Sequence, residues 1–233
     1  MRIDQLDELI AGWHKSLCPH IELASLISRN NTAHKWKATY RSIVLRELVC
    51  WRFTDLLAQA AHLIRSQHIL GARILIRSAI ETLAILIYLN QRTEAVLNGT
   101  MSFFDFASMT SRLMLGSRNA TTRHEAINIL SVLEKCEKRY PGIAKVYGDL
   151  SESAHPNYDG VTAGYSEINE KEYKTEFKNR WAERAGQREL ELLEICVRTF
   201  EEEYNDIWPG LFAKLEHWLV ANDATLEEQK NRI

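Results

Sequence analysis

The sequence predicts an all-α protein, folded as a single bundle of about seven to nine helices. Only 10 of its 233 residues are Gly and 4 are Pro. An all-β protein needs a turn every 8–12 residues or so, and these residues supply the turns. Apolar residues recur at helical spacing along most of the chain, whereas strand-like alternation is confined to Val161–Tyr165. The composition, 45% hydrophobic and 26% charged, excludes global disorder.

The first half of the chain divides into helices at recognisable start and stop signals. Pro19 stands at a favoured first position, and Asn30–Thr32 forms a break followed by an N-cap. Thr93 and Thr100 are expected to cap two shorter helices. The predicted helices are Ile3–Lys15, Ile21–Ile27, Lys35–Arg65, Ala72–Asn90, Glu94–Asn98 and Ser102–Leu115.

The second half starts with a predicted loop, Gly116–Thr121. Thr122 and Glu125 then have the T-x-x-E form of a capping box, which predicts a helix start at Thr122. The longest stretch without helical period is Pro156–Ser166. The expected helices are Thr122–Arg139, Pro141–Ala154, Glu170–Ile207 and Pro209–Ala221. Residues 1–222 are therefore predicted to form a single helical domain, followed by a polar tail, 223–233.

Charge and cysteine usage restrict the partners and the compartment. The net charge is −2, so binding of duplex DNA through bulk charge is not expected, and any contact with nucleic acid must use a local patch. The four cysteines form no C-x-x-C motif and lie in apolar helical stretches, as expected of reduced thiols in a cytoplasmic protein. No metal or cofactor motif is found, and none is expected.

The most apolar helix carries a charged stripe. Arg73, Arg77 and Glu81 are spaced four residues apart, so they follow one face of Leu70–Leu89. Each would cost about 2.5–3.5 kcal/mol at the centre of a bilayer, which favours a buried helix over a membrane span. Buried charges need partners. The stripe is either a structural ion-pair network or the lining of a pocket or dimer cleft that holds an anion.

The segment from Leu150 to Gly160 carries a second candidate site. His155 precedes Pro156, so its backbone is expected to be extended and its imidazole to lie in a loop. Ser151 lies one turn earlier and could face it. The histidine is either a helix-end residue or a general acid or base. A Ser-His-Asp triad is disfavoured because the chain has no G-x-S-x-G elbow.

These two motifs resemble those of an uncharacterised family of bacterial all-helical proteins. The family has an A-R-x-x-x-R-x-x-x-E helix, as in Ala72–Glu81, and a later L-S-x-x-x-H-P loop, as in Leu150–Pro156. The similarity covers roughly Leu48–Tyr165. It implies an α-helical fold and carries no settled activity.

A second resemblance is to HEPN-type helical proteins, many of which are metal-independent ribonucleases. Their motif is an Arg, often followed by a polar residue, with a His after four to six residues. Arg29–His34 and Arg118–His124 both fit it. The resemblance implies that His abstracts the proton of a 2′-OH while Arg stabilises charge on the phosphate. It also implies a homodimer in which two such sites meet.

Three functions remain open from the sequence. The first is a HEPN-like protein that acts on RNA, as a ribonuclease of a bacterial toxin or phage-defence system. The second is a non-catalytic helical interaction or regulatory module, and the third a protein that binds a small anion or nucleotide. The candidate site residues are His155, Arg73, Arg77, Glu81, Ser151, Arg118 and His124.

Overall fold

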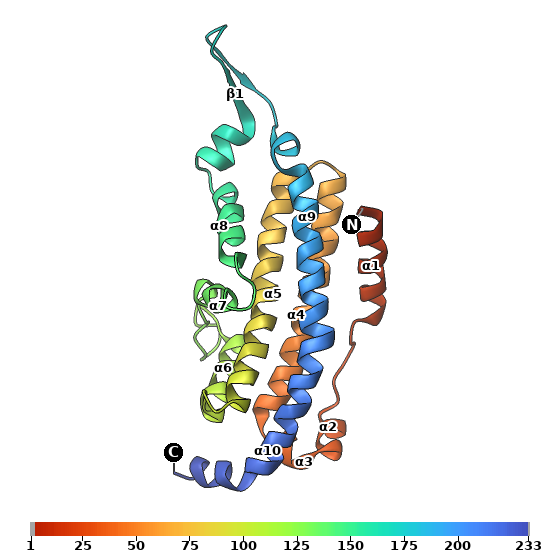
Figure 1. Cartoon of the computed structure of the whole chain (residues 1–233), viewed down its shortest axis with the longest axis vertical. Coiled ribbons are helices and arrows are strands. Elements are labelled where there is room, and N and C mark those ends of the chain that lie inside the picture. Colours follow the sequence, from red (N-terminus) through yellow and green to blue (C-terminus); the bar gives the residue numbers. More distant parts are fainter. Residues whose placement is uncertain (1–2, 233) are drawn as a thin grey trace. The chain divides into compact units, whose positions relative to one another are not determined.

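The structure is a computed structural model that describes residues 3–232. It is helical over 76% of its length, as the sequence predicts. The described chain forms ten α-helices, two π-helical segments and one two-stranded hairpin (Figure 1). The helices are α1 (Ile3–Ser16), α2 (Leu23–Arg29), α3 (Asn31–His34), α4 (Lys37–Arg65), α5 (Ile69–Leu97), α6 (Phe103–Leu115), α7 (Ile129–Cys136), α8 (Ile143–Ala154), α9 (Trp181–Glu201) and α10 (Trp208–Lys230). The other elements are η1 (Tyr158–Ala163), β1 (Ser166–Asn169), β2 (Lys174–Phe177) and η2 (Glu202–Ile207).

The chain groups into two compact units. Unit 1 consists of Met1–Leu17, Cys50–Ala84 and Leu133–Thr199, and unit 2 of Cys18–Val49, Ile85–Val132 and Phe200–Ile233. Unit 1 buries large side chains that include Phe53, Leu57, Ile76, Leu133, Leu150, Trp181 and Leu193. Unit 2 buries Leu86, Ile87, Leu89, Phe106, Leu215 and Leu219. The predicted extent of the domain, 1–222, stays a prediction.

Helix α5 is longer than predicted. The sequence placed a break near Thr93, but α5 runs without interruption to Leu97. Thr93 donates from Oγ1 to the carbonyl of Leu89 at 2.9 Å, one turn earlier in the same helix. A threonine that bonds back to its own helix does not cap a new one. The cap of the following helix is Ser102, whose Oγ accepts from the N–H of Asp105 at 3.1 Å.

The predicted helix start at Thr122 is wrong. Residues 116–128 form a loop, and α7 begins only at Ile129. The side chain of Thr122 donates to the carbonyl of Leu115 inside the loop, and Glu125 forms a β-bridge with Ser117. The capping box therefore does not form, because both of its residues are held by the loop.

The segment after α8 also differs from prediction. Residues 158–163, which include most of the candidate strand Val161–Tyr165, form the π-helical segment η1. The strands lie further on, where β1 and β2 pair as an antiparallel hairpin. Strand β2 falls where the sequence predicted the start of the helix Glu170–Ile207. The long helix begins instead at Trp181 and continues through η2 into α10. The predicted polar tail is helical up to Lys230.

No helix in residues 3–232 is long and apolar enough to cross a membrane. The charges on α5 contribute to this result, as the sequence suggests.

Candidate functional site

Arg73 is buried in unit 1 and fully engaged. It forms an ion pair with Glu189 on α9, and it donates from Nε to Ser153 Oγ at 2.8 Å and from Nη2 to the Asp149 carbonyl at 3.1 Å. Burial raises the pKa of Glu189, and the charge of Arg73 opposes that rise. The guanidinium also lies 5.4 Å from the ring centroid of Trp181. These contacts give Arg73 the partners that a buried charge requires.

Arg77 and Glu81 form a second, half-exposed cluster with α8. Arg77 donates from Nε to Ser151 Oγ at 2.8 Å and from Nη2 to the Tyr147 hydroxyl at 2.6 Å. The Tyr147 hydroxyl donates to Glu81 at 2.9 Å, and Arg77 lies 3.3 Å from the same carboxylate. The structure thus brings the stripe together with Ser151. It adds Tyr147, which the sequence analysis missed although it lies one turn before Ser151.

His155 lies at the C-terminal end of α8 with the extended backbone predicted from Pro156, at φ −92° and ψ 149°. Its side chain is exposed and has no hydrogen bond or ion pair with any described residue. Ser151 donates to the Tyr147 carbonyl at 2.8 Å and bonds Arg77, rather than His155. The nearby acids that could orient the imidazole are engaged elsewhere, Glu152 with Asn157 and Asp159 with Arg184. The Ser-His-Asp arrangement is therefore not formed.

A cleft of about 580 Å³ lies beside the stripe in unit 1. Its charged lining residues compensate one another, because Arg184 lies 2.6 Å from Asp159 and Arg188 lies 2.8 Å from Asp149. Each of these two arginines therefore already has a carboxylate partner. The lining consists of Arg73, Asp149, Glu152, Asn157, Tyr158, Asp159, Trp181, Arg184, Ala185 and Arg188. Arg77, Glu81, Ser151 and His155 do not line it.

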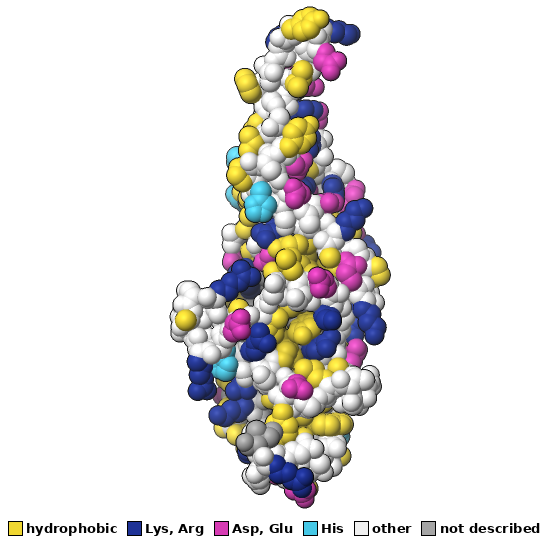
Figure 2. Space-filling model, turned by 90° about the vertical axis from the view of Figure 1, so that its left-hand side faces the viewer, with side chains coloured by type: hydrophobic (Ala, Val, Ile, Leu, Met, Phe, Trp, Pro, Cys, Tyr) yellow, Lys and Arg dark blue, Asp and Glu magenta, His cyan; other side chains and the backbone are white. Residues whose placement is uncertain are grey.

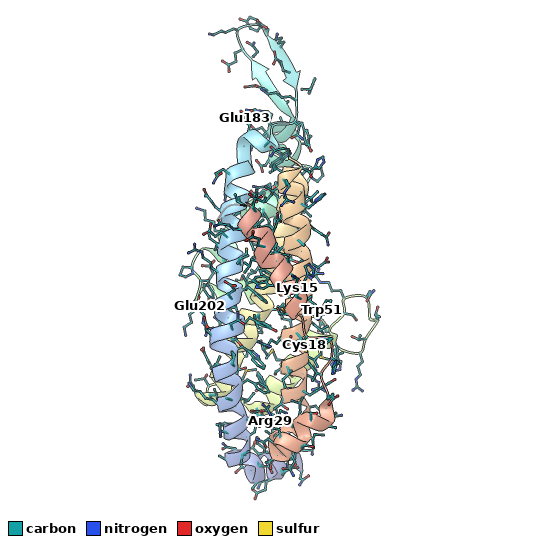
Figure 3. All side chains as sticks on the ribbon, turned by 90° about the vertical axis from the view of Figure 1, so that its right-hand side faces the viewer. Lys15, Cys18, Arg29, Trp51, Glu183 and Glu202 are labelled. Atoms are coloured by element: carbon teal, nitrogen blue, oxygen red, sulfur yellow. The ribbon has the colours of Figure 1, made fainter. Side chains whose placement is uncertain are left out.

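The first R-to-H match folds into a closed network in unit 2. Arg29, at the end of α2 (Figure 3), lies 3.2 Å from His34 Nε2, and both side chains contact the carboxylate of Glu216. His34 Nδ1 lies 3.2 Å from Thr39 Oγ1. The His34 side chain is completely buried, and burial lowers its pKa. A buried imidazole with both nitrogens engaged cannot reach a ribose hydroxyl.

The second match lies in the loop 116–128 of unit 2, which is held by many internal hydrogen bonds. Ser117 N–H donates to the His124 carbonyl at 2.9 Å, and Thr122 N–H donates to Ser117 Oγ at 3.0 Å. Gly116 permits the loop to close, since a Cβ there would lie 2.3 Å from the Arg112 carbonyl and 2.7 Å from Ala126 Cα. The loop backbone is therefore fixed although it has little regular structure.

Four arginines lie in or beside this loop, which also carries the exposed carboxylate of Glu125. They are Arg41 on α4, Arg112 on α6, and Arg118 and Arg123 in the loop; we call them the basic surface. None of them forms an ion pair with a described residue. Burial and the nearby charge of Arg123 lower the pKa of Arg41. Figure 2 shows Lys and Arg side chains around the loop that protrudes at the left edge of that view.

The structure does not join Arg118 to His124 directly. Arg118 is exposed, His124 is half-buried, and no hydrogen bond links their side chains within the described chain. His124 also lies in a loop, whereas the sequence placed it in the first turn of a helix. His124 lies in the same loop as Arg118, which belongs to the basic surface. Sequence spacing could not reveal this surface, because Arg41 and Arg112 come from other elements.

No family model, curated protein or solved structure matches the chain. No group of three or more His, Cys, Asp or Glu side chains among residues 3–232 is arranged to hold a metal ion.

Proposed function

We propose that unit 2 binds RNA through the basic surface formed by Arg41, Arg112, Arg118 and Arg123. The observation that carries this proposal is that four arginines lie in or beside one loop of unit 2 and that none of them forms an ion pair with a described residue. Like charges held together destabilise a fold, and a bound polyanion removes that repulsion. Arginines of unit 1 such as Arg184 and Arg188 are, in contrast, each paired with an aspartate.

The shape and size of the surface favour RNA over duplex DNA. A net charge of −2 leaves no general attraction for a long duplex, so only a local contact is available. The basic surface is centred on an irregular loop, not on an exposed helix that could enter a major groove. Arginine side chains can bond phosphates and also stack on unpaired bases, which are the features that single-stranded RNA presents.

The proposal extends to cleavage of the bound strand at His124. An imidazole can take the proton from a ribose 2′-OH, and the resulting alkoxide attacks the adjacent phosphorus. The bond between phosphorus and the 5′-oxygen breaks, and the 5′-oxygen leaves with a proton from water. A guanidinium beside it stabilises the charge on the phosphate, a role that Arg118 or Arg123 would fill. The resemblance to HEPN-type proteins predicts the same division of roles for Arg118 and His124.

Binding is tested by fluorescence anisotropy with a labelled single-stranded RNA. We expect the double variant Arg118→Glu/Arg123→Glu to lose at least ~10-fold in affinity, since contacts to phosphate carry most of such binding. The matched control is Arg198→Glu/Arg232→Glu, which makes the same change in net charge at two exposed arginines. Equal affinities of the two double variants would contradict the proposal.

Cleavage is tested on the same RNA with chelator present. His124→Ala should retain binding and lose cleavage, and His34→Ala, which removes the buried histidine, serves as the comparison. If the wild-type protein binds RNA without cutting it, the binding proposal stands and the assignment of His124 is wrong.

A further inference from the structure

The hairpin of unit 1 is an isolated two-stranded sheet. Strand β1 pairs with β2 in a register that places Ser166 opposite Phe177 and Asn169 opposite Lys174. No other strand pairs with either of them in the described chain, and every residue of β2 is exposed. Its base is anchored where Arg180 donates to the carbonyls of Gly164 and Ser166, at 2.9 and 3.0 Å. A lone two-stranded hairpin is at best marginally stable in water.

The two faces of the hairpin differ sharply. Side chains alternate between faces along a strand, so Ile168, Thr175 and Phe177 share one face, while Glu167, Lys174 and Glu176 share the other. Ile168 is 71% exposed and Phe177 is 84% exposed. Tyr173, just before β2, is 95% exposed. Exposed apolar side chains that cluster on one face are typical of a surface that another surface covers.

The outer edge of β2 offers a regular row of backbone groups. Lys178 N–H donates to the Tyr165 carbonyl at 3.0 Å, which makes this pair a hydrogen-bonded pair of the ladder. Because such pairs alternate in antiparallel strands, Lys174 and Glu176 also bond toward β1. The N–H and C=O groups of Thr175 and Phe177 therefore point away from β1, along the open edge.

We propose that two copies of the chain pair through this open edge, with β2 antiparallel to β2 of the second copy and a two-fold axis at Thr175. In that register Thr175 lies opposite the partner's Thr175, and the outward backbone groups of these two residues meet. Lys174 lies opposite the partner's Glu176. Paired threonines and opposite charges are cross-strand neighbours that stabilise antiparallel sheets.

Charge selects this register over its neighbours. Moving the two-fold axis to residue 174 places Lys174 opposite its own copy, and moving it to residue 176 does the same for Glu176. Like charges directly opposite each other destabilise a sheet. Within one chain Lys174 lies 3.2 Å from Glu176 and also contacts Glu172. The pairing lets each of these charges gain a partner on its open side.

The pairing also removes the two weaknesses of the hairpin. Two strands become a four-stranded antiparallel sheet, which has the number of strands that independent stability requires. The face with Ile168, Thr175 and Phe177 becomes continuous with its copy, so its exposed apolar side chains gain neighbours. A charged residue such as Lys174 normally protects an edge from pairing, but here the second copy presents the charge that satisfies it.

Charge exchange tests the proposal in the full chain by sedimentation velocity. The wild-type protein should dimerise, and Lys174→Glu and Glu176→Lys should each be monomeric. A mixture of these two variants should form a dimer, and so should the double variant Lys174→Glu/Glu176→Lys. Recovery of the dimer shows that the single variants keep the hairpin. Glu170→Lys, in the turn, makes the same charge change as Glu176→Lys and should remain dimeric.

A cysteine at the axis tests the register directly. In a Cys18→Ser background, Thr175→Cys should form an interchain disulfide under mild oxidation, because directly opposite residues of a hydrogen-bonded pair have Cα atoms about 5.5 Å apart. Asn169→Cys, on the other strand, should not. A wild-type protein that stays monomeric at its highest soluble concentration, a Lys174→Glu variant that still dimerises, or equal crosslinking of both cysteine variants would overturn the proposal.

Discussion

Arginine has two distinct roles in this chain, and the difference lies in its partners. Arg73 is buried and is bonded to Glu189, Ser153 and the backbone of Asp149. Arg118 is exposed and has no carboxylate partner in the described chain. The first arrangement stabilises the fold. The second arrangement leaves the positive charge of Arg118 available to an external anion.

The buried ion pair of Arg73 and Glu189 gives a prediction about stability. Removal of one member of a buried ion pair leaves an uncompensated charge, so Arg73→Met should lower the free energy of unfolding by about 3–5 kcal/mol. Arg77→Met, on the half-exposed cluster of the same helix, should cost about 1 kcal/mol. Urea denaturation of both variants measures the difference. Equal losses would show that the two arginines are not in different environments.

His34 gives a prediction about pH. Burial lowers its pKa, with Glu216 opposing and Arg29 adding to the shift. Since the folded pKa lies below the unfolded one, the histidine contributes stability above its ordinary pKa and loses it as the pH falls through the folded pKa. His34→Gln should therefore flatten the fall in unfolding free energy below about pH 6.5. Parallel curves for the wild type and the variant, measured by denaturation between pH 7.5 and about pH 5, would contradict this.

At the scale of elements, local signals predicted helices well and their ends less well. The helical spacing of Lys35–Arg65 gave α4 almost to the residue, and Pro141 correctly preceded α8. Thr93 and Thr122 have the composition of caps, but their hydroxyls bond to carbonyls of Leu89 and Leu115 instead. A hydroxyl group has several possible partners nearby, and residue type alone does not decide between them. The sequence did not predict the hairpin, because its strands are only four residues long and show too little alternation to be recognised.

Two glycines of the α8 region provide a matched test of this packing. A Cβ at Gly160 would lie 2.0 Å from the His155 carbonyl and 2.9 Å from that of Ser153, whereas a Cβ at Gly148 meets nothing within 4 Å. Gly160→Ala should therefore destabilise the protein by about 1–3 kcal/mol. Gly148→Ala, inside helix α8, should stabilise it by up to about 1 kcal/mol. Thermal melts of both variants measure the two shifts, and a neutral Gly160→Ala would show that the turn after α8 is looser than described.

At the scale of the whole molecule, the candidate sites were predicted in part. The spacing of Arg73, Arg77 and Glu81 correctly predicted one charged stripe, and the first of the two interpretations, an ion-pair network, describes Arg73. The sequence could not supply Glu189 or Tyr147 as partners, because long helices offer many acids and hydroxyls at equivalent spacing. It also could not group Arg41 and Arg112 with Arg118, since a surface assembled from three elements has no linear motif.

The central claim, that the basic surface binds RNA, is tested most directly by the salt dependence of binding. For single strands the slope of log K against log salt concentration is about −0.7 per phosphate contact. Arg118→Glu/Arg123→Glu should therefore reduce the magnitude of the slope by at least ~1.4 relative to wild type, while Arg198→Glu/Arg232→Glu should leave it unchanged. Identical slopes for the wild type and for Arg118→Glu/Arg123→Glu would contradict the claim.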